Sequence, residues 1–163
     1  MYLNKAMFQI VAEKMSLKTK LNGITLLLGC CFIVISILIY VFLRTTDIPI
    51  VRFADDIGLR NASSTINASS FPVWIRFSLP DGLWLLSYEM FVSILWKYNC
   101  KSKYYLCFCL FLPAFAIVCE LFQINGIVRG TFDMADIICY FFATILGISH
   151  CITFNYILYG KEK

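Results

Sequence analysis

The sequence predicts an all-α membrane protein, a four-transmembrane-helix bundle that occupies residues 1–163 as one integral membrane domain. Three observations predict this class: 60% of the residues are hydrophobic, only 15% are charged, and the apolar residues form long runs. About 20 apolar residues in a helix, each rising about 1.5 Å, cross the roughly 30 Å of hydrocarbon in a bilayer. This composition excludes an ordinary soluble globular protein.

Four stretches are the predicted spans. They are residues 24–43, 82–98, 104–122 and 137–159, with a long outer loop at 44–80. The first is free of charge, whereas the second is short and carries Glu89. The first span begins too far from the N-terminus for a signal peptide and lacks a convincing cleavage site, so we expect it to remain as an anchor.

The basic residues divide by type between the two sides of a four-span arrangement. Every lysine lies before the first span, in the turn 97–103 or after the fourth span, and every arginine lies in the other two loops. Under the positive-inside rule the lysine-rich turn is cytoplasmic, and the loop 123–136, with one arginine and two aspartates, is outside. Both termini are then cytoplasmic.

The N-terminal segment is amphipathic, with apolar residues at helical spacing and lysines between them. Leu3, Met7, Ile10 and Val11 form the apolar side. This pattern is typical of a short helix lying on an anionic cytoplasmic leaflet, and equally of a frayed basic tail.

Small residues recur every four positions along the last span, at Cys139, Ala143, Gly147 and Cys151. Such a ridge lets helix backbones approach closely in lipid, so we interpret it as a packing face. His150, on the same helix, is assigned to an interhelical hydrogen bond and not to catalysis.

Polar side chains gather at one level of the predicted bundle, at its outer end. The set comprises Asp81, Glu89, Glu120, Gln123, Arg129, Asp133 and Asp136. The functional interpretation is a pocket that opens outward below the headgroups. In it, Glu120, Asp133 and Asp136 are the candidate general acid and base residues, because adjacent carboxylates raise one another's proton affinity.

The remaining four residues of the set are candidate ligand-binding groups. Arg129 suits a phosphate or carboxylate, and Gln123, Asp81 and Glu89 supply the other contacts. Carboxylates also hold divalent cations, but no metal motif is present, and we assign neither a metal ion nor a cofactor. No nucleic-acid partner is expected.

Each polar residue also has a structural interpretation. Asp81 and Asp133 have the positions of helix N-caps, and Thr131 is an alternative cap for the last helix. Glu120 and Gln123 suit the surface of a helix end. Glu89 lies too deep for an ionised surface side chain, so we expect it to face the bundle interior and point toward the other acids. We also expect Arg129 to be their charge partner, within about 4 Å of at least one of them.

The stretch Glu120–Asp136, "ELFQINGIVRGTFDMAD", resembles the core signature of the VanZ-like membrane proteins, named for a teicoplanin-resistance protein. The matching residues are Glu120-x2-Gln123, Arg129, Asp133-x2-Asp136 and Gly147, and "LPDGLW" at 79–84 resembles the start of an inner helix in that family. The match covers roughly residues 80–150 and departs at Tyr140, where the family usually has Asn, and at Ala143, where it often has Gly. The resemblance implies a small multi-pass protein of the bacterial inner (plasma) membrane, with a role in the cell envelope and antibiotic resistance.

Three hypotheses for the function follow. In the first, the protein binds or modifies an envelope lipid or a lipid-linked glycan in the outward-facing pocket. In the second, it is a non-catalytic membrane subunit whose last helix packs through its small-residue ridge on a membrane protein partner. In the third, it is a small ion-coupled transporter that uses Glu89. The sequence does not separate an enzyme from a binding protein.

Overall fold

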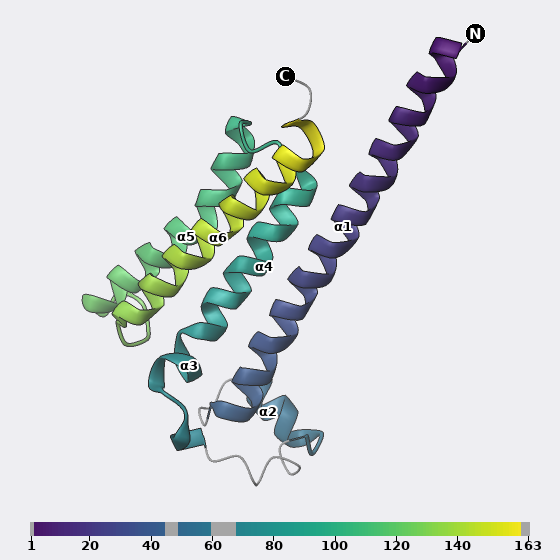
Figure 1. Cartoon of the computed structure of the whole chain (residues 1–163). Helices are drawn as coiled ribbons and strands as arrows, with labels where there is room; N and C mark the ends of the chain where they lie inside the picture. Colours follow the sequence, from purple (N-terminus) through teal and green to yellow (C-terminus); the bar gives the residue numbers. More distant parts are fainter. Residues whose placement is uncertain (1, 45–48, 60–67, 161–163) are drawn as a thin grey trace.

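A computed structural model describes residues 2–44, 49–59 and 68–160, and the side chains from residue 12 onward. Within these residues the chain is helical and contains no strand. The order is α1 (Tyr2–Leu43), α2 (Pro49–Asp56), the 3-10 helix η2 (Ala68–Ser70), α3 (Val73–Phe77), α4 (Leu79–Leu95), α5 (Lys103–Ile124) and α6 (Met134–Tyr159). Figure 1 shows α1, α4, α5 and α6 running alongside one another, with α2 and α3 at one end.

Three helices are long and apolar enough to cross a membrane. They are the Ala12–Leu43 part of α1, α5 and α6. Large hydrophobic side chains cover their outer faces, among them Leu27, Phe111 and Phe142, which are 65%, 64% and 59% exposed. A surface this apolar favours lipid as its surroundings, which confirms that the chain is a membrane protein.

Helix α4 overlaps the predicted second span, 82–98, but is not one of these three helices, and it is the central helix of the bundle. Nine of its 17 residues are buried, against five of 26 in α6. It packs on α1 along one side and on α6 and α5 along the other. Because other helices cover it, α4 faces little lipid, and it can carry Ser87, Glu89 and Ser93 without exposing them to hydrocarbon. This explains its weak apolar pattern.

The two ends of the bundle differ in charge. At one end, called the acidic end, α1 and α5 finish, α4 and α6 begin, and Asp81, Glu120, Asp133 and Asp136 lie there. At the other, called the basic end, α4 finishes and α5 begins, joined by the turn that carries Lys97, Lys101 and Lys103. Figure 1 shows the described end of α6 at the basic end as well.

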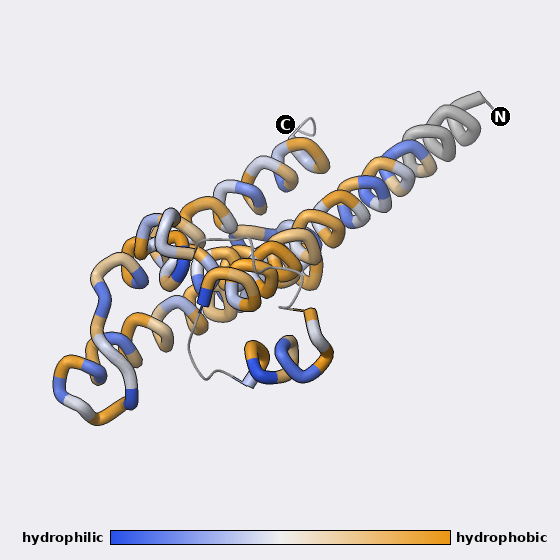
Figure 2. Tube along the Cα trace, turned by 90° about the horizontal axis from the view of Figure 1, so that it is seen from below, coloured by the Kyte–Doolittle hydropathy of each residue, from blue (hydrophilic) through white to orange (hydrophobic). Residues whose placement is uncertain are grey.

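Helix α1 differs from the expectation for the N-terminus. It continues without a break from Tyr2 to Leu43, 42 residues or about 63 Å, and extends well past the basic end of the other helices. The N-terminal segment is therefore collinear with the first span and is neither a separate interfacial helix nor a frayed tail. Figure 2 shows hydrophilic and hydrophobic residues alternating in the coloured part of α1 that comes before its hydrophobic middle.

One face of α1 packs on α4 through small and polar residues. Ser36 donates a hydrogen bond to the Pro80 carbonyl at 2.9 Å, and Ser87 of α4 donates to the Gly29 carbonyl at 2.8 Å. A Cβ at Gly29 would lie 2.7 Å from the Phe91 ring, so a larger residue there would require that ring to move. Helices in lipid associate through such close packing and hydrogen bonds.

The small-residue ridge of α6 is a packing face, as predicted, but its partner is α4. A Cβ at Gly147 would lie 2.4 Å from Glu89 Cβ, and Cys139 Cβ lies 3.0 Å from the Cβ position of Gly82. Ala143 and Cys151 are buried in the same interface. Helix α4 thus covers Gly147 and Cys151 of the ridge, whereas Cys139 is half-buried and, with Ala143, lines an apolar pocket of about 500 Å³ between α4 and α6.

Candidate functional site

A polar pocket of about 430 Å³ opens at the acidic end of the bundle, and we call it the acidic-end pocket. It lies where the end of α1, the short α3, the starts of α4 and α6 and the end of α5 meet. Its lining residues are Arg44, Val73, Phe77, Asp81, Glu120, Gln123, Gly130, Thr131, Asp133 and Asp136. Five of the seven predicted site residues therefore line one cavity.

Glu120 and Gln123 share one face of α5, as their spacing predicts. Gln123 Nε2 donates to Glu120 Oε1 at 3.3 Å, and the Asp133 backbone N–H donates to Glu120 Oε2 at 3.4 Å. Glu120 is only 6% exposed, which excludes the interpretation as a surface residue. Gly130, at φ +145°, passes the Gln123 amide so closely that a Cβ would lie 2.7 Å from it. The loop between α5 and α6 therefore packs directly on the end of α5.

Asp133 is the N-cap of α6. Its Oδ1 accepts a hydrogen bond from the Ala135 backbone N–H at 2.9 Å, which confirms the capping interpretation and assigns the cap to Asp133 in place of Thr131. Asp136 follows in the first turn, where the helix dipole favours a carboxylate. Its Oδ1 is buried and has no hydrogen-bond partner among the described residues. Among the buried side-chain oxygens of the pocket acids in the described residues, Asp136 Oδ1 is thus the one without a hydrogen-bond partner.

Asp81 contacts α1 and does not cap α4. The residue at the N-cap position of α4 is Ser78, and Asp81 lies inside the first turn. Its Oδ1 accepts a hydrogen bond from the Tyr40 hydroxyl. The N-cap interpretation of Asp81 is therefore wrong, and the contact instead ties the end of α1 to the start of α4.

The cation in the lining is Arg44 and not Arg129. Arg129 is exposed in the loop after α5 and is absent from the lining residues. Arg44 is half-buried, its guanidinium lies 4.6 Å from the centre of the Tyr40 ring and 5.1 Å from that of Phe77, and its Nε has no partner among the described residues. The expected position of Arg129 among the acids is corrected accordingly.

Glu89 also lies away from the pocket. It is fully buried between helices and, as predicted, faces away from lipid, but its Oε2 accepts a hydrogen bond from the Cys109 thiol of α5 and it does not line the cavity. The expectation that it points toward the other acids is wrong. His150 does make the predicted interhelical contact, with Nε2 3.1 Å from Thr25 Oγ1 of α1.

Sequence reasoning missed Arg44 and Tyr40 as site residues. Both lie at the end of the first span, where an arginine and a tyrosine are ordinary interfacial residues, so nothing local distinguishes them. The signal that could have identified them is their predicted depth, which is the same as that of Asp81 and on the same predicted side of the membrane.

The charge of the lining residues determines which ligands the pocket can bind. Four carboxylates face one guanidinium, so negative charge is in excess and groups that donate hydrogen bonds are favoured over a bare anion. Within residues 2–44, 49–59 and 68–160, no three His, Cys, Asp or Glu side chains are placed to hold one metal ion. The unpartnered Asp136 Oδ1 can accept a hydrogen bond from a ligand or act as a general base.

No protein-family model, no curated protein and no solved structure matches the chain.

Proposed function

We propose that this chain is a VanZ-like protein of the bacterial plasma membrane whose acidic-end pocket binds the headgroup of an envelope lipid or a lipid-linked glycan. The observation that carries the proposal is the convergence of four carboxylates, an amide and Arg44 in one open cavity at the end of apolar helices. A ligand anchored in the bilayer would meet the pocket at headgroup depth.

In this proposal α4 is a fourth span. Its 17 residues cover about 26 Å, close to the hydrocarbon thickness, and it runs beside α5 and α6 in Figure 1. The lysines of the basic end favour a cytoplasmic position for that end. The acidic-end pocket then opens to the outside, and both termini are cytoplasmic.

The ligand carries several hydrogen-bond donors. Sugar hydroxyls or a primary ammonium would donate to the carboxylates, and a single phosphate would contact Arg44. A phosphate without such donors would meet four acids and one arginine and bind poorly. Among the candidate catalytic residues, Glu120 and Asp133 hold the loop and the helix cap, so Asp136 is the residue assigned to contact the ligand or to act as its base.

In the subunit alternative a partner would have less of the α6 ridge to pack on, because α4 already contacts Gly147 and Gly82 lies against Cys139. This alternative remains distinguishable by experiment, since a subunit would show no dependence on headgroup chemistry.

The test measures the melting temperature of the purified full chain in detergent with added short-chain lipids. Phosphatidylethanolamine or a diglucosyl diacylglycerol should stabilise the protein, because binding to the folded state raises stability. Phosphatidylcholine, whose ammonium has no N–H, should stabilise it less. Asp136→Asn should remove the difference, and Asp56→Asn, an exposed acid on α2, should preserve it. Equal responses to all lipids, or a response unaffected by Asp136→Asn, would contradict the proposal.

A further inference from the structure

Glu89 is a buried carboxyl group that the acidic-end pocket does not use. It is fully buried in the middle of α4, and its Cβ and Cγ lie against Gly147 of α6. The Cys109 thiol donates to Oε2, whereas Oε1 has no hydrogen-bond partner among the described residues. Whether this carboxyl group is neutral or ionised depends on the groups packed around it.

The groups packed around Glu89 supply no positive charge. From α5 it faces the Cys109 thiol and, beyond it, the Tyr105 hydroxyl; from α6 it faces Gly147, with Cys151 one turn further on. The face of α1 that packs on α4 contributes the Gly29 carbonyl, which accepts from Ser87; its titratable Tyr40 is bonded to Asp81 at the acidic end, and Cys30 and Cys31 are exposed. On α4 itself, Tyr88 is adjacent. No positively charged group of the described chain acts on the carboxyl.

An ionised carboxylate without a cation is strongly disfavoured away from water, so the neutral, protonated acid is the stable form here. Holding a proton, in turn, requires a way for that proton to enter and leave.

The layer between Glu89 and the basic end is rich in exchangeable groups. Cys109 Sγ lies 3.7 Å from the Tyr105 hydroxyl, and both side chains belong to one buried cluster with Cys151 and Tyr98. The Tyr98 hydroxyl lies 3.0 Å from Thr25 Oγ1, which in turn contacts His150. Hydroxyl, thiol and imidazole groups therefore occupy the layer between Glu89 and the turn that follows α4.

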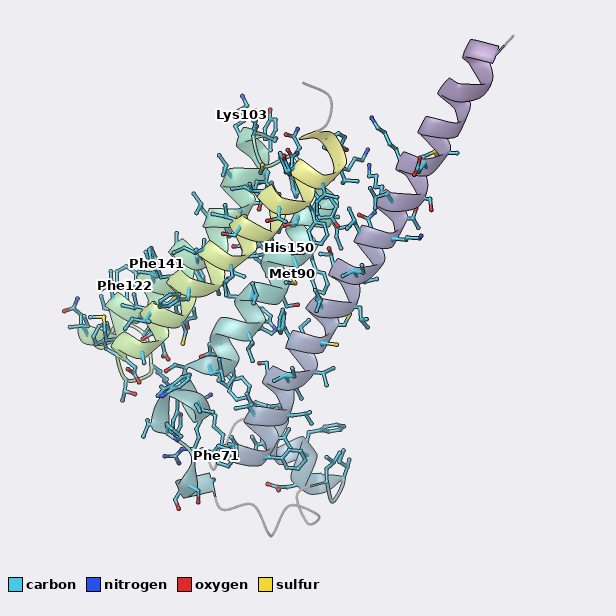
Figure 3. The ribbon with its side chains drawn as sticks, viewed as in Figure 1. Phe71, Met90, Lys103, Phe122, Phe141 and His150 are labelled. Atoms are coloured by element: carbon cyan, nitrogen blue, oxygen red, sulfur yellow. The ribbon has the colours of Figure 1, made fainter. Side chains whose placement is uncertain are left out.

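The layer between Glu89 and the acidic end is different. It is a cluster of Leu85, Leu86, Met90, Tyr140 and Ala143, with Phe32, Leu112 and Ile117 packed around it. The hydroxyl groups in this layer are those of Tyr140 and of Tyr88, which packs against the cluster and donates to the Phe108 carbonyl at 2.6 Å. Figure 3 labels Met90 of this apolar layer and, nearer the basic end, His150 of the polar layer.

We propose that Glu89 is a proton-binding site inside the bundle, and that it exchanges its proton with the basic end through Cys109 and Tyr105. For each proton released, the O–H bond at Glu89 breaks as an S–H bond forms at Cys109, the proton already on that sulfur passes to the Tyr105 oxygen, and the Tyr105 hydroxyl releases its own proton toward the basic end. The reverse transfers re-protonate Glu89 from the same end and restore the neutral acid. The site is separate from the acidic-end pocket, so either can fail without the other.

The first experiment records infrared spectra of the full chain in lipid at neutral pH, for the protein and for Glu89→Gln. The difference should contain the carbonyl band of a protonated carboxylic acid. In heavy water this band should shift as the proton exchanges, and Tyr105→Phe should slow the shift at least tenfold. Tyr104→Phe, which removes the hydroxyl of an exposed neighbour, should leave the rate unchanged. Carboxylate bands in the difference spectrum, or equal exchange rates in the two tyrosine variants, would overturn the proposal.

A second measurement needs no substitution at Glu89. Dicyclohexylcarbodiimide reacts with protonated carboxyl groups in apolar surroundings, and mass spectrometry of the labelled chain locates the adduct. The adduct should form on Glu89 and not on Glu13, which is exposed on α1. Labelling of Glu13 with an unmodified Glu89 would overturn the proposal as well.

Discussion

Gly147 lies where α6 passes Glu89 of α4, and the absence of a side chain there is what permits the contact. A Cβ would lie 2.4 Å from Glu89 Cβ, which forces the two helices apart. Gly147→Ala should therefore destabilise the protein by about 1–3 kcal/mol, the usual cost of overpacking. The measurement is thermal unfolding in detergent. Gly23→Ala on α1 is the control, since nothing lies within 4 Å of its Cβ position. Equal melting temperatures for both variants would mean that α4 and α6 are not in this contact.

At the scale of the elements, α4 is held to α1 by hydrogen bonds between side chains and carbonyl groups of the other helix. The double variant Ser36→Ala, Ser87→Ala removes two of them. Each bond should contribute about 0.6–1.5 kcal/mol, so the melting temperature should fall. Thr153→Ala removes a hydroxyl that bonds only within α6, to the Ser149 carbonyl, and should have a smaller effect. A double variant as stable as Thr153→Ala would place α1 away from α4.

Features that lie within one element can be predicted from the sequence, whereas contacts between elements cannot. The pair Glu120 and Gln123 and the cap at Asp133 depend on spacing within one helix or at one helix start, so local rules suffice for them. The contact of Tyr40 with Asp81 depends on how α1 lies against α4, which spacing along the chain does not reveal. Arg129 is close to the acids in sequence, but its side chain in the loop is exposed.

For the whole molecule, apolar runs locate both ends of α5 and α6, and the end of α1, to within a few residues, because hydrocarbon thickness sets the length of a span. The same rule predicts α4 only weakly, because a helix that is enclosed by other helices need not be apolar on every face. It also fails to give the length of α1, because helix continuity past the membrane depends on backbone hydrogen bonds and not on hydropathy.

The topology of the whole chain separates four spans from three. With α4 as a span, a reporter fused after Lys163 and another in the turn 97–103 should both be cytoplasmic, and a reporter near Asn67 should be outside. Asn67 lies outside the described residues, within the predicted outer loop. If only the three long helices cross, the C-terminus and the N-terminus lie on opposite sides. A C-terminal reporter outside, with the N-terminus cytoplasmic, would contradict the four-span arrangement.

The central claim is that Arg44, and not Arg129, is the cation of a headgroup-binding pocket. The most direct measurement is the affinity of the purified chain for short-chain phosphatidylethanolamine in Arg44→Gln and Arg129→Gln, with the melting temperature without lipid recorded for each. Loss of a charge-assisted hydrogen bond of about 1.5–3 kcal/mol should weaken binding roughly tenfold or more in Arg44→Gln. Arg44→Lys should recover part of it, and Arg129→Gln should bind like the unmodified protein. Weakened binding in Arg129→Gln, with Arg44→Gln unchanged, would contradict the account.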